Sequence, residues 1–476
     1  METAEAAGRA LIGGEWQAEP DGRTFTVFDP ATGAAIAEVA DGGAELTGRA
    51  VDAAAAALPG WRALAAHERA GLMRRAADEL TARAASIGAT MTAEQGKPLA
   101  EATAEVLSGA EHLLWAAEET RRLYGQTVPG ATADNRIWLL PEPVGVVAGI
   151  TPWNFPVSMI TRKLGPALAA GCTVVLKPAE LTPLSAIAVA EAFTAAGLPP
   201  GVFNLVPTAR PALFAETVMA DRRVRKVSFT GSTEVGRELI RRSAEDVKRL
   251  SVELGGHAPV LVFPDADPVA AAAAVARSKF LNAGQACTSP NRIFVHRDVA
   301  ADFTAALARH AEAIEPGVDM GPLIDAAALA KVERHVEDAL ARGAKAVTGG
   351  RRIDGPGTFF PPTVLSGVTD DMLVCREETF GPVAPVIEFD AVDEVVARAN
   401  ATAYGLTAYV WTADLTRTLR VAEELEFGMV TVNGGPLAPP QAPFGGIKNS
   451  GYGREGGGLG VADYLDYKYL SVGLGR

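Results

Sequence analysis

Cys287 is the residue whose type and surroundings best suit covalent chemistry on a carbonyl carbon. It lies in the polar stretch NAGQACTSPNR after an expected helix, whereas Cys172 lies in an apolar junction and Cys375 in a charged approach to a loop. A thiolate is a strong nucleophile, so a cysteine in a polar loop can attack a substrate. A buried cysteine is more often inert, and we favour that interpretation for Cys172 and Cys375.

Two further side chains suit the same chemistry. Glu253, in SVELGGHAP, ends an apolar strand pattern and precedes two glycines. A carboxylate placed there can act as a general base, although a lone Glu is more often a solvated surface charge. Asn154 lies in TPWNFP (151–156), between prolines and aromatic residues. Its amide could donate to a developing oxyanion; alternatively, this is only a loop packed by Trp153 and Phe155.

Two short motifs suit a nucleotide cofactor. FTGSTEVG (229–236) follows a strand and opens a helix, where Gly231 permits a tight turn. A helix N-terminus favours phosphate, but the motif is not the full Gly-x-Gly-x-x-Gly fingerprint, so an ordinary capped helix is equally consistent. KPAE (177–180) follows another strand and could bind ribose hydroxyls with Lys177 and Glu180. In isolation, a surface ion pair is the better interpretation.

The remaining pattern predicts the elements that position these side chains. Apolar strand-like runs alternate with Ala-rich amphipathic helices, which is typical of a parallel α/β sheet. We expect helices over residues 44–58, 66–85, 99–121, 164–170, 182–196 and 234–242. Strands are expected over 144–150, 173–176, 202–206 and 226–229, and together these elements describe a dinucleotide-binding domain.

A second α/β series begins after Glu253. We expect strands over 259–263, 292–296, 383–389 and 428–432, with a helix over 268–281. Two extended segments, 124–143 and 464–474, fit neither series. Each could be an arm that pairs with another subunit.

Composition limits the class of protein. A length of 476 residues suits two or more domains, and 48% hydrophobic with 21% charged residues excludes disordered and fibrous classes. The net charge of -13 argues against a nucleic-acid partner. Three cysteines form no disulfide framework. We find no secretory signal, transit pattern, membrane span or metal-ligand pattern, so we expect a cytoplasmic enzyme without a metal.

Taken together, the motifs resemble the aldehyde dehydrogenase superfamily over essentially the whole chain. The matching stretches, in the family's order and spacing, are ITPWNFP (150–156), KPAE (177–180), FTGSTEVG (229–236), VELGGHAP (252–259), GQACTSPNR (284–292), EETFGPV (377–383) and PFGGIKNSGYGRE (443–455). Individually these stretches are weak signals. A chance match to all of them is negligible.

The resemblance implies a role for each matching residue. Cys287 would attack the aldehyde, Asn154 and the Cys287 backbone N–H would hold the oxyanion, and Glu253 would activate water to hydrolyse the thioester. The implied cofactor is NAD(P), with NAD favoured because Glu180 would repel a 2′-phosphate, while NADP stays possible. The implied cofactor contacts are Thr151, Pro152, Trp153, Lys177, Glu180, Gly231, Ser232, Glu378 and Phe380.

The resemblance also implies a three-part α/β fold. A Rossmann-like cofactor domain would span 1–123 and 144–253, and an α/β catalytic domain 254–455. A small β oligomerisation flap would span 124–143 and 456–476. The family forms homodimers or homotetramers, so self-association is expected, beside a small-molecule aldehyde as the other partner.

The substrate is where the chain departs from its nearest branch. MITRKLGPALAAGC (159–172) and YGREGGGLGVADYLDYKYL (452–470) resemble succinate-semialdehyde dehydrogenases, which bind the substrate carboxylate with two arginines and a serine. Arg162 matches the first arginine, but Leu281 and Ala438 occupy the other positions. Each lost charged hydrogen bond costs about 1.5–3 kcal/mol. We therefore predict a less acidic or larger aldehyde, aliphatic or aromatic, with succinate semialdehyde as the alternative, in a pocket of Phe155, Met159, Arg162, Leu281, Thr288 and Phe444.

Two rival functions stay open at this stage. A CoA-acylating dehydrogenase would pass the thioester to a thiol and would not need Glu253, so Glu253 favours hydrolysis. A non-catalytic structural protein could share the fold. Such a protein should have lost the nucleophile or the base, and Cys287 and Glu253 are both present.

Overall fold

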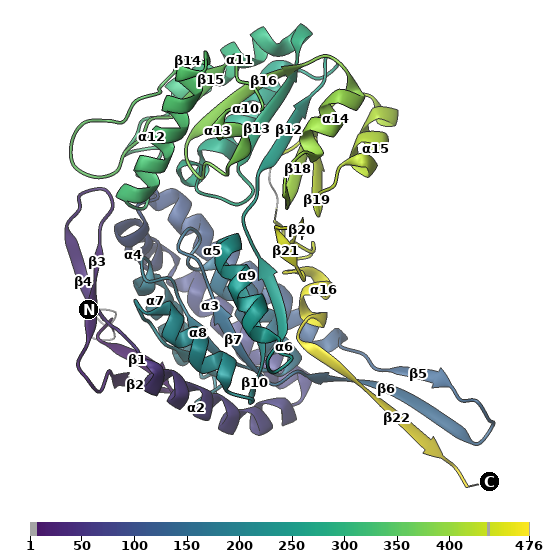
Figure 1. The fold of residues 1–476 in the computed structure, drawn as a ribbon. Coiled ribbons are helices and arrows are strands. Elements are labelled where there is room, and N and C mark those ends of the chain that lie inside the picture. Colours follow the sequence, from purple (N-terminus) through teal and green to yellow (C-terminus); the bar gives the residue numbers. More distant parts are fainter. Residues whose placement is uncertain (1–6, 436–437, 476) are drawn as a thin grey trace.

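Two largely parallel sheets, each covered by helices, dominate the computed structural model, which describes residues 7–435 and 438–475 (Figure 1). The first sheet has the order β2 (Glu15–Ala18), β1 (Arg9–Ile12), β9 (Phe203–Leu205), β8 (Thr173–Lys177), β7 (Val146–Ile150), β10 (Val224–Thr230), β11 (Arg249–Glu253) and β21 (Gly451–Tyr452). The strands from β9 to β11 run parallel. This confirms the expected α/β class.

Helices bury both faces of the first sheet. One face carries α2 (Ala44–Ala63), α8 (Pro211–Ala220) and α9 (Thr233–Ser243). The other face carries α3 (Ala66–Ala82), α4 (Ala84–Gln95), α5 (Leu99–Glu119), η1 (Thr120–Arg122), α6 (Ser158–Ala170), α7 (Pro183–Ala195) and α16 (Gly457–Ala462). Because both faces are covered, β7 and β8 are largely apolar runs rather than alternating ones.

The second sheet has the order β14 (Lys345–Thr348), β15 (Thr363–Ser366), β16 (Val383–Phe389), β13 (Pro290–His296), β12 (Ala258–Val262), β18 (Thr407–Trp411) and β19 (Met429–Val432). Its core is one continuous cluster. Its helices are α10 (Pro268–Phe280), η2 (Leu281–Gly284), α11 (Arg297–Glu312), α12 (Ala326–Ala341), α13 (Leu373–Arg376), α14 (Val392–Asn400) and α15 (Leu415–Glu424). Two small ribbons complete the body, β3 (Thr24–Phe28) with β4 (Ala35–Ala40) and β17 (Tyr404–Gly405) with β20 (Ile447–Lys448).

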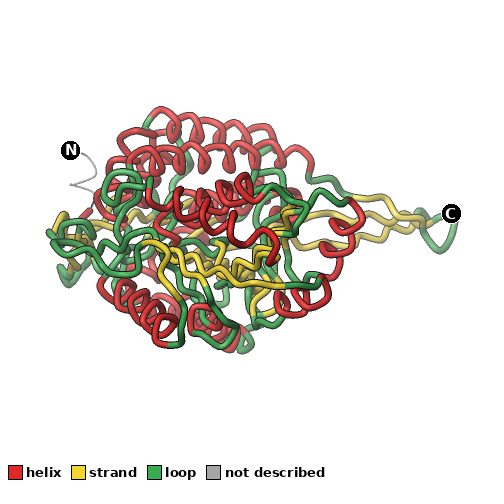
Figure 2. The backbone as a smooth tube through the Cα atoms, turned by 90° about the horizontal axis from the view of Figure 1, so that it is seen from above, coloured by secondary structure: helices red, strands yellow, loops and turns green. Residues whose placement is uncertain are grey.

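A three-stranded arm projects from the body. It consists of β5 (Gln126–Pro129), β6 (Asn135–Pro143) and β22 (Leu465–Gly473), and its length is clear from above in Figure 2. The arm exposes large apolar side chains, among them Trp138, Leu140, Tyr467, Tyr469 and Leu470. The two extended segments that fit neither α/β series are therefore neighbours in space, because β22 pairs with β6 over its whole length.

The predicted domain boundaries meet two complications. α16, from residues assigned to the flap, packs against α5 and α6 on the first sheet. β21, from residues assigned to the catalytic segment, pairs with Val252 and Glu253 at the edge of the first sheet. The chain thus returns to the first sheet near its end. The division into domains stays a prediction.

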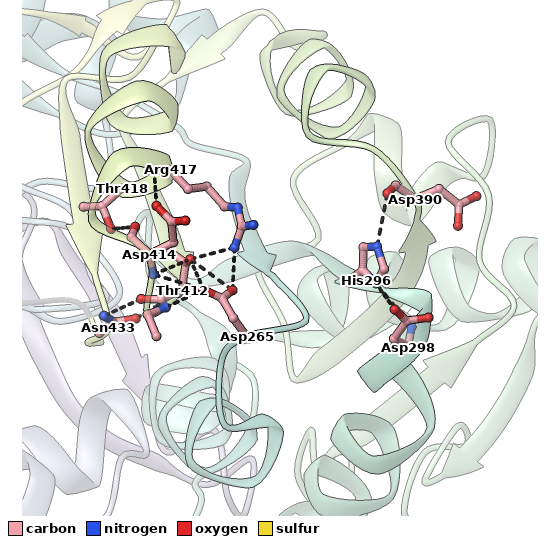
Figure 3. Close-up of polar contacts among 10 residues, drawn as sticks. Asp265, His296, Asp298, Asp390, Thr412, Asp414, Arg417, Thr418 and Asn433 are labelled. Atoms are coloured by element: carbon pink, nitrogen blue, oxygen red, sulfur yellow. Dashed lines mark hydrogen bonds and ion pairs between the residues drawn. The ribbon is translucent and has the colours of Figure 1, made fainter.

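A cluster of polar contacts around Asp265 fixes a turn of the second sheet (Figure 3). The Asp265 carboxylate accepts hydrogen bonds from Thr412 Oγ1 at 2.8 Å, from the backbone N–H groups of Ala413 and Asp414 at 3.0 Å, and from Arg417 at 2.6 Å. These bonds tie the end of β12 to the loop before α15. The cluster is satisfied internally, so its role is structural.

Of the helices in the ranges 7–435 and 438–475, none combines the length and apolarity needed to cross a bilayer.

Candidate active site

The parallel strands of the first sheet end at a common edge, and several predicted site residues lie there. Glu253 ends β11, Lys177 ends β8 and Thr151 follows β7. The registers pair Ile150 with Lys177 and Thr230 with Glu253, so these strand ends are level with one another. Ligands bind outside the carboxyl ends of such strands.

A cavity of about 490 Å³ opens beside this edge. Cys287 lines it, together with all six residues predicted for the substrate pocket: Phe155, Met159, Arg162, Leu281, Thr288 and Phe444. Helices α5 and α6 supply one wall, and β18 and β19 another. Sequence positions more than a hundred residues apart therefore meet around one thiol.

The loop that carries Cys287 begins with a strained turn. Asn282, Ala283 and Gly284 have φ values of 49°, 54° and 73°, in the left-handed region. Gly284 also lies against Gly381, since a Cβ at 284 would come within 2.2 Å of the Gly381 carbonyl oxygen. Strain of this kind persists only where surrounding contacts hold it, so the loop has a defined conformation.

Burial raises the pKa of the half-buried Cys287 thiol to about 12, with Glu378 and Glu253 adding to the effect and Arg162 opposing it. At neutral pH the resting group is therefore a protonated thiol. It needs a base, or a change in its surroundings, to become the nucleophilic thiolate.

Glu253 is a buried carboxylate, and neither of its oxygens has a hydrogen-bond partner among the described residues. Burial and the neighbouring Glu455 raise the pKa of Glu253 well above its usual range. Leaving a carboxylate buried and unpaired is costly. Such a group is available to exchange protons with a thiol or a water molecule.

Behind Glu253 lies an ion pair that the sequence analysis missed. Lys163 Nζ donates to Glu455 Oε1 and to Thr230 Oγ1, at 2.6 Å in both cases. A signal was available for Lys163, because it is a charged residue in α6, a helix buried along its whole length. Glu455 ends the matching stretch PFGGIKNSGYGRE (443–455), but a glutamate at the end of a glycine-rich motif gives no indication that it is buried.

Two glycines allow the nucleophile loop to approach the end of β11. A Cβ at Gly256 would lie 2.4 Å from the Cys287 carbonyl oxygen, and one at Gly255 would lie 2.8 Å from Glu378 Oε2. The pair after Glu253 is thus needed for close approach. A larger residue would push the nucleophile loop or Glu378 away from the general-base candidate.

Asn154 lies in the loop after β7 and is buried. Its Nδ2 donates to the carbonyl oxygen of Gln285 at 3.0 Å, two residues before Cys287. Its backbone carbonyl accepts from Lys97 Nζ and from Asn282 Nδ2, each at 2.9 Å. The amide is therefore held beside the nucleophile loop.

Comparison with known proteins places this site in a family. The family model described as aldehyde dehydrogenase family matches residues 16–470. The chain belongs to the aldehyde dehydrogenase family. It is 48% identical over 472 residues to succinate-semialdehyde dehydrogenase [NADP(+)] of Escherichia coli, covering 98% of both chains. It is 49% identical to a glutarate-semialdehyde dehydrogenase of Pseudomonas aeruginosa, covering 98% of this chain and 97% of that one.

The fold agrees with solved structures of the same family. A succinate-semialdehyde dehydrogenase from Burkholderia pseudomallei superposes with a TM-score of 0.96 at 50% identity, covering 98% of each chain. The chain is therefore an aldehyde dehydrogenase, an oxidoreductase that uses a nicotinamide cofactor. The predicted family, fold and enzyme class are confirmed, which sets aside the non-catalytic alternative.

Most cofactor residues predicted for this aldehyde dehydrogenase follow strands of the first sheet at the same edge as Glu253, whereas Glu378 and Phe380 lie in the loop before β16 of the second sheet. Lys177 Nζ binds Glu180 Oε2 at 2.8 Å, so the predicted ribose pair is also an ion pair. Burial acts to raise the pKa of Glu180, but Lys177 overcomes it and holds that pKa below the usual value. Glu180 is therefore ionised at neutral pH, and its side chain keeps 43% exposure to meet a ligand.

The remaining cofactor residues fit the group as well. Ser232 caps α9, its Oγ accepting from Val235 N at 3.3 Å, and the residues of this helix start are exposed or half-buried. The Trp153 and Phe380 rings meet edge to face at 5.6 Å. Glu378 Oε1 accepts from Gly256 N at 3.0 Å. A helix N-terminus and an aromatic pair are features that suit a dinucleotide.

One further charged residue lies near Glu378. Lys331 of α12 is close enough to Glu378 for that carboxylate to oppose the lowering of the lysine pKa by burial. Glu378 itself has its pKa raised to about 7 by burial. Sequence reasoning missed Lys331 because one lysine in an amphipathic helix resembles any other surface charge.

Proposed function

We propose that this aldehyde dehydrogenase oxidises an aldehyde that carries an anionic group at its far end. The observation that carries the proposal is Arg162. Its side chain is 7% exposed, it lines the Cys287 cavity, and its guanidinium stacks on the Phe444 ring at 4.8 Å. Among residues 7–435 and 438–475 it has no ion pair, and Arg162 Nε has no hydrogen-bond partner. Buried cations are usually paired, so the substrate is the natural counter-ion.

The volume of the cavity suits a substrate with more than four carbon atoms. A volume of about 490 Å³ lies in the range of ~300–1,000 Å³ that holds drug-sized ligands. Leu281 and Ala438 line the cavity at the two positions where succinate-semialdehyde dehydrogenases have an arginine and a serine. An aliphatic or aromatic aldehyde with one carboxylate suits these walls. Succinate semialdehyde, with four carbons, also carries one carboxylate and is the smaller alternative, and the two relatives are named for semialdehydes of this kind.

The residues of the chain perform the covalent steps. The Cys287 thiol loses its proton to solvent, the Sγ thiolate attacks the aldehyde carbon, and the Asn154 amide and the Cys287 N–H donate to the resulting oxyanion. A bound nicotinamide cofactor supplies the hydride acceptor. The product on the enzyme is then a thioester of Cys287. Glu253 takes a proton from water, which attacks the thioester and releases the acid.

We propose NAD as the preferred cofactor, although the Escherichia coli relative is named for NADP(+). Glu180 supports this preference because an ionised carboxylate accepts from a ribose 2′-hydroxyl and repels a 2′-phosphate. Lys177 would contact the same ribose on its 3′-hydroxyl side. We also place the protein in a reducing cytoplasm, where Cys287 remains a thiol.

Glu180→Ser is expected to narrow the ratio of kcat/KM for NAD over NADP by about tenfold, which corresponds to ~1.4 kcal/mol of lost repulsion and lost hydrogen bonding. The half-exposed position of Glu180 keeps the effect modest. Steady-state kinetics with both cofactors at one fixed aldehyde concentration measure it. An unchanged ratio would refute the role of Glu180.

Arg162→Leu is expected to lower kcat/KM for carboxylated aldehydes by about 10–150-fold, because a charged hydrogen bond is worth ~1.5–3 kcal/mol. Hexanal and benzaldehyde should lose clearly less, because they share only the loss of the effect of Arg162 on the pKa values of Cys287 and Glu253. A panel of succinate semialdehyde, longer semialdehydes, a carboxybenzaldehyde, hexanal and benzaldehyde tests this. Equal losses on charged and neutral substrates would contradict the proposal.

We further propose that the arm mediates self-association into a homodimer or homotetramer. The outer strand β22 has a free edge, and the arm exposes Trp138, Tyr467 and Tyr469 to solvent. Exposed strand edges and apolar patches are pairing surfaces. The three-part division predicted from the sequence stays part of this proposal.

A further inference from the structure

Residues 95–105, at the junction of α4 and α5, contact both walls of the oxyanion site proposed above, yet nothing in the sequence had marked them. Lys97 Nζ donates to the carbonyl oxygen of Asn154 at 2.9 Å. Gln95 Nε2 donates to Asn282 Oδ1 at 2.8 Å, and Glu101 Oε2 accepts from Asn282 N at 3.1 Å. One short segment thus reaches the loop of Asn154 and the turn that leads to Cys287.

On the Asn154 side the contact is a buried ion pair. Lys97 is 2% exposed, and its ammonium binds Glu105 Oε2 at 2.5 Å. The other oxygen of Glu105 accepts from the backbone N–H groups of Val157 at 2.9 Å and Ser158 at 3.2 Å. The pair therefore holds the loop after β7 at both of its ends, at Asn154 and at the start of α6.

On the nucleophile side the contacts hold strained backbone. Asn282 and Ala283 adopt left-handed conformations that L-residues disfavour, so they need external support. Gln95 and Glu101 bind the side chain and the N–H of Asn282. Asn282 Nδ2 in turn donates to the Asn154 carbonyl at 2.9 Å. The two walls meet at that carbonyl oxygen, which accepts from Lys97 and Asn282 together.

We propose that Lys97 is a positioning residue for the oxyanion site: through the Asn154 carbonyl it fixes the Asn154 amide relative to Cys287. The inference rests on the proposed role of Asn154. Lys97 need not touch the reacting atoms. Its effect comes from geometry, because a displacement of about 1 Å in a positioned donor can cost ~10²-fold in rate.

Lys97→Met is expected to lower kcat/KM about 10–100-fold per Cys287 thiol, counted by alkylation and mass spectrometry. That normalisation separates positioning from a smaller folded fraction. The decisive measurement is a double-mutant cycle with Asn154→Ala. If Lys97 acts through Asn154, Lys97→Met should cost less than threefold in the Asn154→Ala background.

Lys248→Met is the matched control. Lys248 is also a buried lysine, with Nζ donating to the carbonyl oxygens of Asp221 at 2.8 Å and Val224 at 2.9 Å, but it lies at the opposite end of β11 from Glu253. It should lower thermal stability while leaving kcat/KM per thiol unchanged. Gln95→Leu keeps the Lys97–Glu105 pair and serves if Lys97→Met does not fold. Gln95→Leu should lower kcat/KM per thiol less than Lys97→Met does, and its effect should likewise shrink in the Asn154→Ala background.

The outcomes distinguish the positioning role of Lys97 from the oxyanion role of Asn154. Equal losses from Lys97→Met, or from Gln95→Leu in its place, with and without Asn154 would overturn the positioning role and leave the oxyanion assignment standing. A Lys97→Met protein with wild-type kcat/KM would also overturn the positioning role. If Asn154→Ala alone has no effect, the oxyanion assignment falls, and the positioning role falls with it.

Discussion

Cys287→Ala is expected to abolish aldehyde-dependent formation of reduced nicotinamide, with a loss of about 10⁴-fold or more in kcat, because removing a covalent nucleophile leaves only the contributions of binding and the oxyanion site. The loss follows from the position of Cys287 in the cavity shared with the six substrate-pocket residues. Absorbance of the reduced cofactor, with saturating aldehyde, measures it.

The chain offers a control for this experiment. Cys375 is 8% exposed and packs in the core of the second sheet. Cys375→Ala should lose some stability but keep kcat within threefold of wild type, since it removes a thiol from the core of the second sheet and not from the Cys287 cavity. A Cys287→Ala protein as active as wild type would remove the basis of the proposed covalent mechanism.

Glu253→Gln is expected to separate the two half-reactions. Acylation should still give a burst of reduced cofactor equal to the number of active sites, while steady-state turnover should fall about 10²–10⁴-fold because water loses its general base. Stopped-flow absorbance resolves the burst. Adding CoA tests the rival in which a thiol accepts the acyl group: a wild-type enzyme that turns over only with CoA would contradict hydrolysis.

The pH dependence supplies a second readout of Glu253. The active form is the carboxylate, so the rate of deacylation rises as pH increases through the pKa of Glu253, which burial and Glu455 hold above the usual range. Glu455→Gln removes the like charge, lowers that pKa and should move the acidic limb to lower pH. Lys163→Met removes an opposing cation and should move the limb to higher pH. The same direction in both variants would contradict this electrostatic account.

Much of the fold could be predicted from the sequence because its central strands are long apolar runs between amphipathic helices. The expected strand over 173–176 is β8, and the expected helix over 99–121 is α5. β21 could not be predicted, because a two-residue strand has no periodicity and its pairing with β11 is set by tertiary contacts. The helix expected over 66–85 is two helices, α3 and α4, joined at Arg83.

The site was predictable where chemistry is concentrated in short motifs and unpredictable where it depends on burial. Cys287, Glu253 and Asn154 stand in local patterns that can be recognised. Lys97 does not, because its contact with Asn154 spans 57 residues and its burial is decided by the packing of α5 against α6. The lack of a partner for Arg162 is likewise a property of the folded cavity, which no spacing in the sequence reveals.

The late return of the chain to the first sheet has a consequence for biosynthesis. β21 and the apolar residues Val461, Tyr464 and Leu465, which join the first sheet and its core, follow the second sheet in the chain, whereas β1 and β2 of the first sheet precede it. A nascent chain on the ribosome therefore exposes an incomplete edge of the first sheet until the whole second sheet has been made, a state prone to aggregation. A truncation after β19 should therefore destabilise the first sheet, although it leaves the strands of the second sheet intact.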